Sequence, residues 1–154
     1  MPKKKASNNK DPSIFYEVFL EVGIIAQLSR AMLEERMPEG LMQPHFSVLS
    51  HLIRVSDGRT PLAIADAFQV PKNTMTHTLK GLESNGLIRL ESNPDDGRSK
   101  LVYITGQGKK MHRDILNALV PGMKIMASEF DLEKLATTLP TLQELRKYLD
   151  KKRS

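Results

Sequence analysis

The chain has 154 residues, of which 40% are hydrophobic and 27% charged, and its formal net charge is +5 at pH 7. This length favours a single domain with appended elements used for assembly. The absence of cysteine excludes disulfides, thiolate metal sites and cysteine-based redox sensing. No apolar run approaches the roughly 20 residues of a membrane-spanning helix, so we expect a cytoplasmic protein with no membrane partner.

The first 12 residues, MPKKKASNNKDP, are expected to form a disordered basic tail. Lys3, Lys4 and Lys5 have two interpretations, a solvated run or an arm that lies along phosphates, and solvated runs are the commoner case. No apolar segment follows these lysines, so the tail is not expected to be a secretory signal.

Residues 13–43 are predicted to contain one strongly apolar helix. Ser13 can cap it, and its apolar positions recur at three- and four-residue steps: Ile14, Val18, Val22, Ile25, Leu28 and Met32. Phe15 and Phe19 widen this stripe, which favours burial against a partner subunit as well as against the helix's own domain. The stretch MPEGLMQP, with two prolines and a glycine, ends the helix.

Residues 44–105 are predicted to form a compact middle segment that starts with helices. The first helix begins near Pro44, and the second begins at Thr60 and Pro61, an N-cap followed by proline at the first helical position. About four residues separate this short helix from the next helical pattern. Two short helices joined so tightly cross at a steep angle, which is the geometry of a helix-turn-helix.

The next helix, NTMTHTLKGLESNG, divides into two faces. Met75, Leu79 and Leu82 define its buried stripe, and the opposite face is short-chained, hydrogen-bonding and cationic, with no carboxylate before Glu83. Solvated helix faces usually mix acids with bases, so this face favours DNA and entry into a major groove. The candidate DNA contacts on this helix are Lys72, Asn73, Thr74, Thr76, His77 and Lys80. Gly81 has two interpretations, a tolerated glycine or a close approach to a phosphate strand.

Two segments of alternating character, LIRLE and LVYIT, flank the turn NPDDGRS and predict a β-hairpin. We expect Arg98 to enter a minor groove and Lys100 to contact a phosphate. Asp95 fits the turn itself. We expect Asp96, two residues before Arg98, to hold the Arg98 guanidinium in one orientation before DNA arrives.

Residues 106–154 are predicted to form two further apolar helices. Thr105 can cap the first, and Pro121 is expected to kink it. The second starts at Asp131 and carries leucines at three- and four-residue steps, with an interruption at Pro140. Like the helix of residues 13–43, both are too apolar for a free surface.

Catalytic and metal-binding patterns are absent from the sequence: it has no H-E-x-x-H, no phosphate-cradling glycine loop and no G-x-S-x-G elbow. His45 and His51 are six residues apart, which does not fit an i, i+4 metal pair. We therefore expect no enzymatic activity, no metal and no cofactor. A small hydrolase that uses the histidines is a remote alternative.

The run from Thr60 to Gly108 resembles the winged helix-turn-helix of the MarR family of bacterial transcriptional regulators. The matching pieces are TPLAIADAFQVPKNTMTHTLKGLESNGLIRL and NPDDGRSKLVYITGQG, and the second is the more specific, with its Asp-x-Arg wing and a Thr-x-x-Gly that opens a helix. The order of the flanking helices also matches, so the resemblance covers nearly the whole chain. His77 stands where the family commonly has arginine, and Gly81 where a longer residue is common, so base specificity does not carry over directly.

The resemblance implies a mainly α (α+β) fold, a winged helix-turn-helix with N- and C-terminal dimerisation helices. It implies a homodimer that binds double-stranded DNA at a pseudo-palindromic operator, with half-sites about 10 bp apart, and acts as a repressor. Small aromatic compounds release many members from DNA, which implies an effector pocket near Phe15, Phe19, Met42, His45 and Phe46. Methionine and phenylalanine at helical spacing are more often core residues. The alternative function is a winged-helix module that binds another protein without sequence-specific DNA binding.

Overall fold

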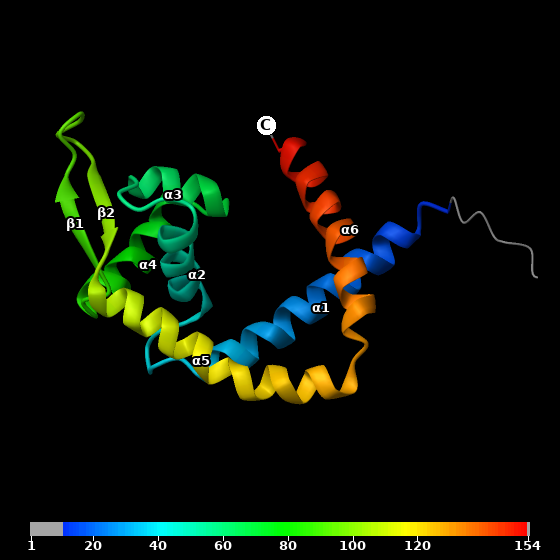
Figure 1. Ribbon diagram of the computed structural model, residues 1–154. Coiled ribbons are helices and arrows are strands. Elements are labelled where there is room, and N and C mark those ends of the chain that lie inside the picture. The colour runs from blue at the N-terminus through cyan, green and yellow to red at the C-terminus, as the bar shows by residue number, and fades with distance from the viewer. Residues whose placement is uncertain (1–10, 154) are drawn as a thin grey trace, which may run out of the picture. The chain divides into compact units, whose positions relative to one another are not determined.

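The computed structural model describes residues 11–153 and is mainly helical with one two-stranded sheet (Figure 1). The elements are α1 (Ile14–Glu34), α2 (Gln43–Arg54), α3 (Pro61–Phe68), α4 (Lys72–Ser84), β1 (Ile88–Ser92), β2 (Lys100–Ile104), α5 (Gly106–Glu129) and α6 (Leu132–Lys151). The predicted order of elements and the predicted fold class are confirmed. Lys3, Lys4 and Lys5 lie outside the described residues. Within the described range, no helix is long and apolar enough to cross a membrane.

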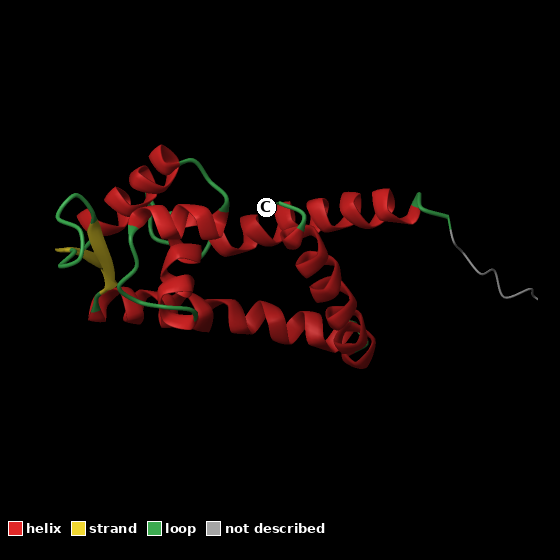
Figure 2. Ribbon diagram, turned by 90° about the horizontal axis from the view of Figure 1, so that it is seen from above, coloured by secondary structure: helices red, strands yellow, loops and turns green. Residues whose placement is uncertain are grey.

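The chain divides after Ile115 into two compact units, so α5 begins in the first unit and ends in the second. The hydrophobic core lies in the first unit, where α2, α3 and α4 surround it and the sheet lies beside them (Figure 2). Its most completely buried large side chains are Val48, Leu49, Ile64, Leu82 and Val102. The core thus joins three helices to the central residue of β2.

The helix-turn-helix forms as predicted. Thr60 caps α3, because its hydroxyl oxygen accepts a hydrogen bond from the Ala63 N–H at 3.2 Å, and Pro61 occupies the first helical position. Gln69 ends the helix with φ +54°, and it is the one described non-glycine residue with a positive φ. This left-handed residue turns the chain from α3 into α4 within three residues.

β1 and β2 form an antiparallel hairpin whose register runs from Ile88 opposite Ile104 to Ser92 opposite Lys100. Arg59 makes an isolated bridge to Val102, so the loop before α3 borders the sheet. The hairpin is therefore attached to the same core that supports α3 and α4.

The Thr-x-x-Gly sequence joins the start of α5 to the turn after α4. The Thr105 hydroxyl accepts a hydrogen bond from the Gly108 N–H at 3.0 Å and donates one to the Gly86 carbonyl at 2.7 Å. A Cβ atom at Gly108 would lie 2.1 Å from the Leu87 carbonyl oxygen. Glycine is required here because the backbone of α5 passes directly against the backbone that leads into β1.

α1 contributes little to the core. Over residues 14–34 no residue is buried, and large apolar side chains including Phe15, Phe19 and Leu20 remain about half exposed. Its C-terminal end is tied to α2, since the Glu34 carboxylate accepts a hydrogen bond from the Gln43 N–H at 2.9 Å.

The second unit holds the end of α5 and α6. The start of the last helix at Asp131 is confirmed, and Asp131 caps α6 by accepting a hydrogen bond from the Lys134 N–H at 3.1 Å. The prediction that Pro140 interrupts the last helix is wrong, because α6 continues through it, and α5 likewise continues through Pro121. A proline removes one backbone donor, and the hydrogen bonds on either side are enough to continue helices of 20 and 24 residues.

Candidate nucleic-acid interface

α4 presents one apolar face to the core and one polar face to solvent. Met75, Thr78, Leu79 and Leu82 are buried. The six side chains predicted to contact DNA are all exposed: Lys72, Asn73, Thr74, Thr76, His77 and Lys80. A helix of 13 residues with this division can enter a groove without losing its packing.

The exposed face of α4 combines hydrogen-bonding groups with positive charge. The Thr76 hydroxyl donates to the Lys72 carbonyl at 2.9 Å, which leaves its oxygen lone pairs and its methyl group for a partner. No acidic residue lies in the first turn of α4, and Glu83 near its end is the one carboxylate of this helix. The positive end of the helix dipole therefore faces outward without a competing negative side chain.

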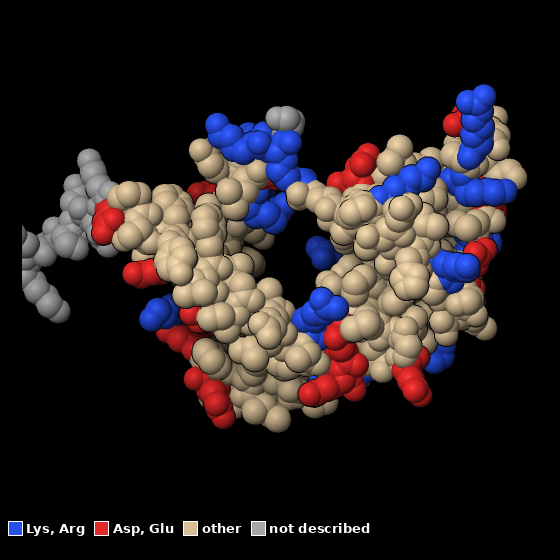
Figure 3. All heavy atoms as spheres, turned by 180° about the vertical axis from the view of Figure 1, so that it is seen from behind, with Lys and Arg blue, Asp and Glu red and all other residues tan. Residues whose placement is uncertain are grey.

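Charge on the rest of this unit is mixed. On the side shown in Figure 3, Lys and Arg side chains are interspersed with Asp and Glu, and the projecting hairpin tip carries both signs. Attraction for an anionic partner therefore depends on local groups on α4 and the hairpin. A uniform positive surface does not supply it on this side.

The wing turn is organised by side chains that bind its backbone. The Asn93 side chain accepts a hydrogen bond from the Asp95 N–H at 3.0 Å and donates one to the Ser99 hydroxyl at 2.9 Å. The Asp96 carboxylate accepts a hydrogen bond from the backbone N–H of Arg98 at 2.9 Å. These bonds fix the tip without using the Arg98 side chain.

The predicted pairing of Asp96 with the Arg98 guanidinium is corrected by this geometry. Among the described residues no carboxylate lies within ion-pair distance of Arg98, and Arg98, Lys100 and Asp96 are all exposed. A carboxylate two residues before an amide N–H closes a short local ring, which competes with the more distant guanidinium. Asp96 therefore shapes the backbone and leaves the arginine free to meet a partner.

Arg89 in β1, which the sequence did not single out, is engaged within the hairpin. Its guanidinium lies 2.8 Å from the Glu91 carboxylate and 4.9 Å from the centroid of the Tyr103 ring. Gly58 makes room for that ring, because a Cβ there would lie 2.8 Å from it. Of the arginines in the hairpin, Arg98 is thus the one without a charged partner among described residues.

His45 and Gly81 lie in contact between α2 and α4. The His45 Nδ1 atom accepts a hydrogen bond from the Met42 N–H at 2.9 Å, and a Cβ at Gly81 would lie 2.7 Å from His45 Nε2. Burial lowers the pKa of His45, and the nearby His77 lowers it further. Gly81 therefore makes room for a neutral imidazole, which neither sequence interpretation of this glycine included.

The five residues predicted to line an effector pocket occupy different surroundings. Phe15 and Phe19 are exposed on α1, with ring centroids 6.2 Å apart, and Met42 is exposed before α2. Phe46 stacks on His112 with a centroid distance of 5.0 Å.

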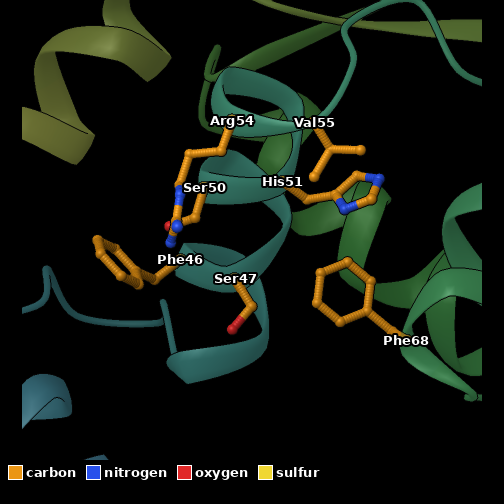
Figure 4. Close-up of a pocket in the computed structure, with 7 residues that line it drawn as sticks. All are labelled: Phe46, Ser47, Ser50, His51, Arg54, Val55 and Phe68. Carbon is orange, nitrogen blue, oxygen red and sulfur yellow. The ribbon is translucent and has the colours of Figure 1, made fainter. Parts of the chain in front are cut away.

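A cavity of about 370 Å³ lies along α2 and includes Phe46. It is lined by Phe46, Ser47, Ser50, His51, Arg54, Val55 and Phe68. In Figure 4 the Arg54 side chain runs back along α2 toward Phe46, while His51 and Phe68 face one another, their ring centroids 5.4 Å apart. The Nε2 atom of His51 is buried without a hydrogen-bond partner. The lining thus combines two phenyl rings, one imidazole, two hydroxyl groups and one guanidinium.

Comparison with known proteins identifies the winged helix-turn-helix. The model of the MarR family matches residues 39–99, which include α2, α3, α4, β1 and the wing turn. This segment of the chain is a winged helix-turn-helix that matches the MarR family of transcriptional regulators. The chain is also 29% identical over 105 residues to the transcriptional regulator HosA of Escherichia coli O111:H-, a match that covers 68% of this chain and 73% of HosA.

Solved structures of MarR proteins share this fold. The crystal structure of MarR superposes with a TM-score of 0.76 at 21% identity and covers 86% of this chain and 90% of its own. PcaV of Streptomyces coelicolor, solved in complex with its natural ligand, gives a TM-score of 0.66 at 17% identity and covers 82% and 89%. The match to the MarR family implies DNA binding and dimerisation, and both the family model and HosA are matches to transcriptional regulators.

Proposed function

We propose that this protein is a cytoplasmic, dimeric repressor of the MarR family that binds a pseudo-palindromic DNA operator. The observation that carries the proposal is the exposed face of α4, which bears Asn73, His77 and Lys80 and meets no carboxylate before Glu83. Asn73 reads a base edge in the major groove, and Lys72 and Lys80 contact phosphates or guanine. Arg98 reaches the adjacent minor groove, and Lys100 contacts the backbone.

Dimerisation through the terminal helices is supported by their exposed apolar side chains. In α1 and α6 no residue is buried, although both helices carry large hydrophobic residues at helical spacing. Apolar area of this kind on a small protein marks an interaction surface. A second copy of the chain covers this apolar surface and supplies the second recognition helix. The two half-sites therefore lie about 10 bp apart.

The cavity along α2 supports a small aromatic effector that carries an acidic group. Phe46 and Phe68 offer rings against which an aromatic compound packs, and Arg54 offers a guanidinium for a carboxylate or phenolate. A neighbour of known structure, PcaV, binds its natural ligand. An effector bound beside α2 would displace α2 and α3, which pack against α4, and would thereby release the protein from its operator.

Selection of bound duplexes from a random pool tests the DNA-binding part of the proposal. We expect a preferred sequence with twofold symmetry, and sedimentation of the free protein should give the mass of a dimer. A preferred sequence without symmetry would contradict the dimeric arrangement. No preference over random DNA would favour a winged-helix module that binds a protein.

Titration with a panel of aromatic acids tests the effector. A compound of the proposed class should displace the wild-type protein from the selected duplex and should fail to displace Arg54→Gln. Equal displacement of both proteins would place the effector elsewhere.

A further inference from the structure

His45 connects the start of α2 to the C-terminal half of α4, the helix proposed to read DNA. His45 is the third residue of α2. Its Nδ1 atom accepts a hydrogen bond from the N–H of the capping residue Met42 at 2.9 Å. This is the position of the glutamate or glutamine in a capping box, which satisfies one of the free donors at a helix start. The ring is therefore held at one edge by the backbone.

The opposite edge of the same ring rests against Gly81. A Cβ at Gly81 would lie 2.7 Å from Nε2 of His45, which is closer than Cβ atoms approach other heavy atoms in proteins, and 3.3 Å from its Cδ2 atom. Gly81 lies inside α4, where a glycine costs helix stability, so its presence needs a compensating reason. The imidazole provides that reason, because only a hydrogen atom fits between the ring and the helix.

The contact fixes α4 at the level of the residues that face DNA. His77 lies one turn before Gly81 and influences the pKa of His45, so the ring lies close to the exposed face of the helix. Burial keeps the His45 ring neutral near pH 7, and a neutral ring retains the Nδ1 lone pair that the Met42 N–H requires. A ring fixed in this way cannot yield to a bulkier residue at position 81 without losing its hydrogen bond.

We propose that His45 is a positioning residue for DNA binding: the ring, fixed by the Met42 amide and seated against Gly81, sets how α4 lies on its unit. The proposal rests on the proposed DNA-binding function. The role proposed for His45 differs from a direct contact with DNA, because His45 acts through the position of α4. It also differs from a phosphate contact at Gly81, because the group that needs the space is a protein side chain.

A double-mutant cycle between positions 45 and 81 tests the proposal. The single variants are Gly81→Ala and His45→Gln, and the third protein carries both changes. Glutamine is a good control because it can accept the Met42 N–H as in an ordinary capping box and has no ring. Gly106→Ala, at a position where a Cβ meets nothing within 4 Å, controls for the loss of a glycine. The affinities for the selected duplex and for random DNA are measured by anisotropy, and thermal melting by circular dichroism shows that each variant folds.

We expect Gly81→Ala to weaken binding to the selected duplex about tenfold, with a smaller loss on random DNA, because the helix that reads the bases is displaced. In the His45→Gln background the same alanine should cost less than about threefold, because the obstructing ring is gone. An equal loss from Gly81→Ala in both backgrounds would overturn the proposal and favour a phosphate contact at Gly81. No loss from Gly81→Ala alone would also overturn it. If the wild-type protein shows no preference for any duplex, the proposed function itself fails, which is a distinct result.

Discussion

The hydroxyl of Ser50 lies 3.0 Å from Nε2 of His112, although the two residues are 62 positions apart in the chain. The contact joins α2 to the first turns of α5, and the His112 ring also stacks on Phe46 of α2. His112 is only 8% exposed, so a proton added to its ring would be charged within a mostly apolar site. Burial lowers the pKa of His112, and the charge of Arg54 lowers it further.

This relationship predicts stability that depends on pH. Below the ordinary histidine pKa of about 6.5 the unfolded chain binds protons that the folded ring resists, so the free energy of unfolding falls as the pH decreases. The stabilisation is fully present above about pH 6.5 and is lost as the pH falls toward the lowered folded-state pKa. Denaturant titrations between pH 7 and pH 5 should show this decline. His112→Gln should show a shallower decline, although His45 and His51 keep part of it because burial lowers their pKa values too. Parallel curves for both proteins would exclude a contribution from His112.

Arg98 and Lys100 should contribute to DNA binding through charge. Arg98→Ala should weaken binding to the selected duplex about tenfold. Arg98→Ala and Lys100→Ala should each reduce the slope of log K against log salt by about 1. Titrations at several salt concentrations measure both quantities. Lys147→Ala, on α6, is the matched control and should change neither. An unchanged affinity for Arg98→Ala at physiological salt would remove this residue from the interface.

Asn73 should determine sequence preference and not general affinity. An asparagine that reads adenine contributes about 1–3 kcal/mol of discrimination against a wrong base, so Asn73→Ala should weaken binding to the selected duplex and leave random DNA nearly unaffected. Binding assays with both duplexes measure the ratio. Equal losses on the two duplexes would mean that Asn73 contacts the backbone only.

Asp96 should matter through its hydrogen bond to the Arg98 N–H and not through its charge. Asp96→Asn keeps an oxygen acceptor and removes a negative charge near DNA, so its affinity should equal or exceed that of the wild-type protein. Asp96→Ala removes the acceptor and should weaken specific binding, because the wing loses one of the bonds that orders it. Asp95→Ala is the control for charge alone. A gain in affinity for Asp96→Ala would show that Asp96 acts as a repelling charge.

Gly108→Ala should strongly destabilise the first unit. The added methyl group would lie 2.1 Å from the Leu87 carbonyl oxygen, so α5 must move away from the strand and lose the Thr105 cap. We expect a loss of at least about 2 kcal/mol in the free energy of unfolding. Gly106→Ala, two residues earlier and unobstructed, should be close to neutral. Chemical denaturation compares the two, and equal stabilities would contradict the close approach.

Most of the helices and both strands could be predicted from local sequence. Thr60 followed by Pro61, the apolar stripe of Met75, Leu79 and Leu82, and the alternation on either side of NPDDGRS all act within a few residues. Caps, helix periodicity and strand alternation depend on near neighbours, which the sequence displays directly. Pro140 misled because a long helix tolerates one lost hydrogen bond, and the residue type alone does not reveal this.

Contacts between distant residues could not be predicted in this way. The sequence by itself determined the winged helix-turn-helix and the acid-free face of α4. Only the tertiary structure brought Ser50 to His112, His45 to Gly81 and Gly108 to Leu87. It also showed that Asp96 binds a backbone N–H, because a carboxylate two residues before an amide is directed by the geometry of the turn and not by the charge of the nearest arginine.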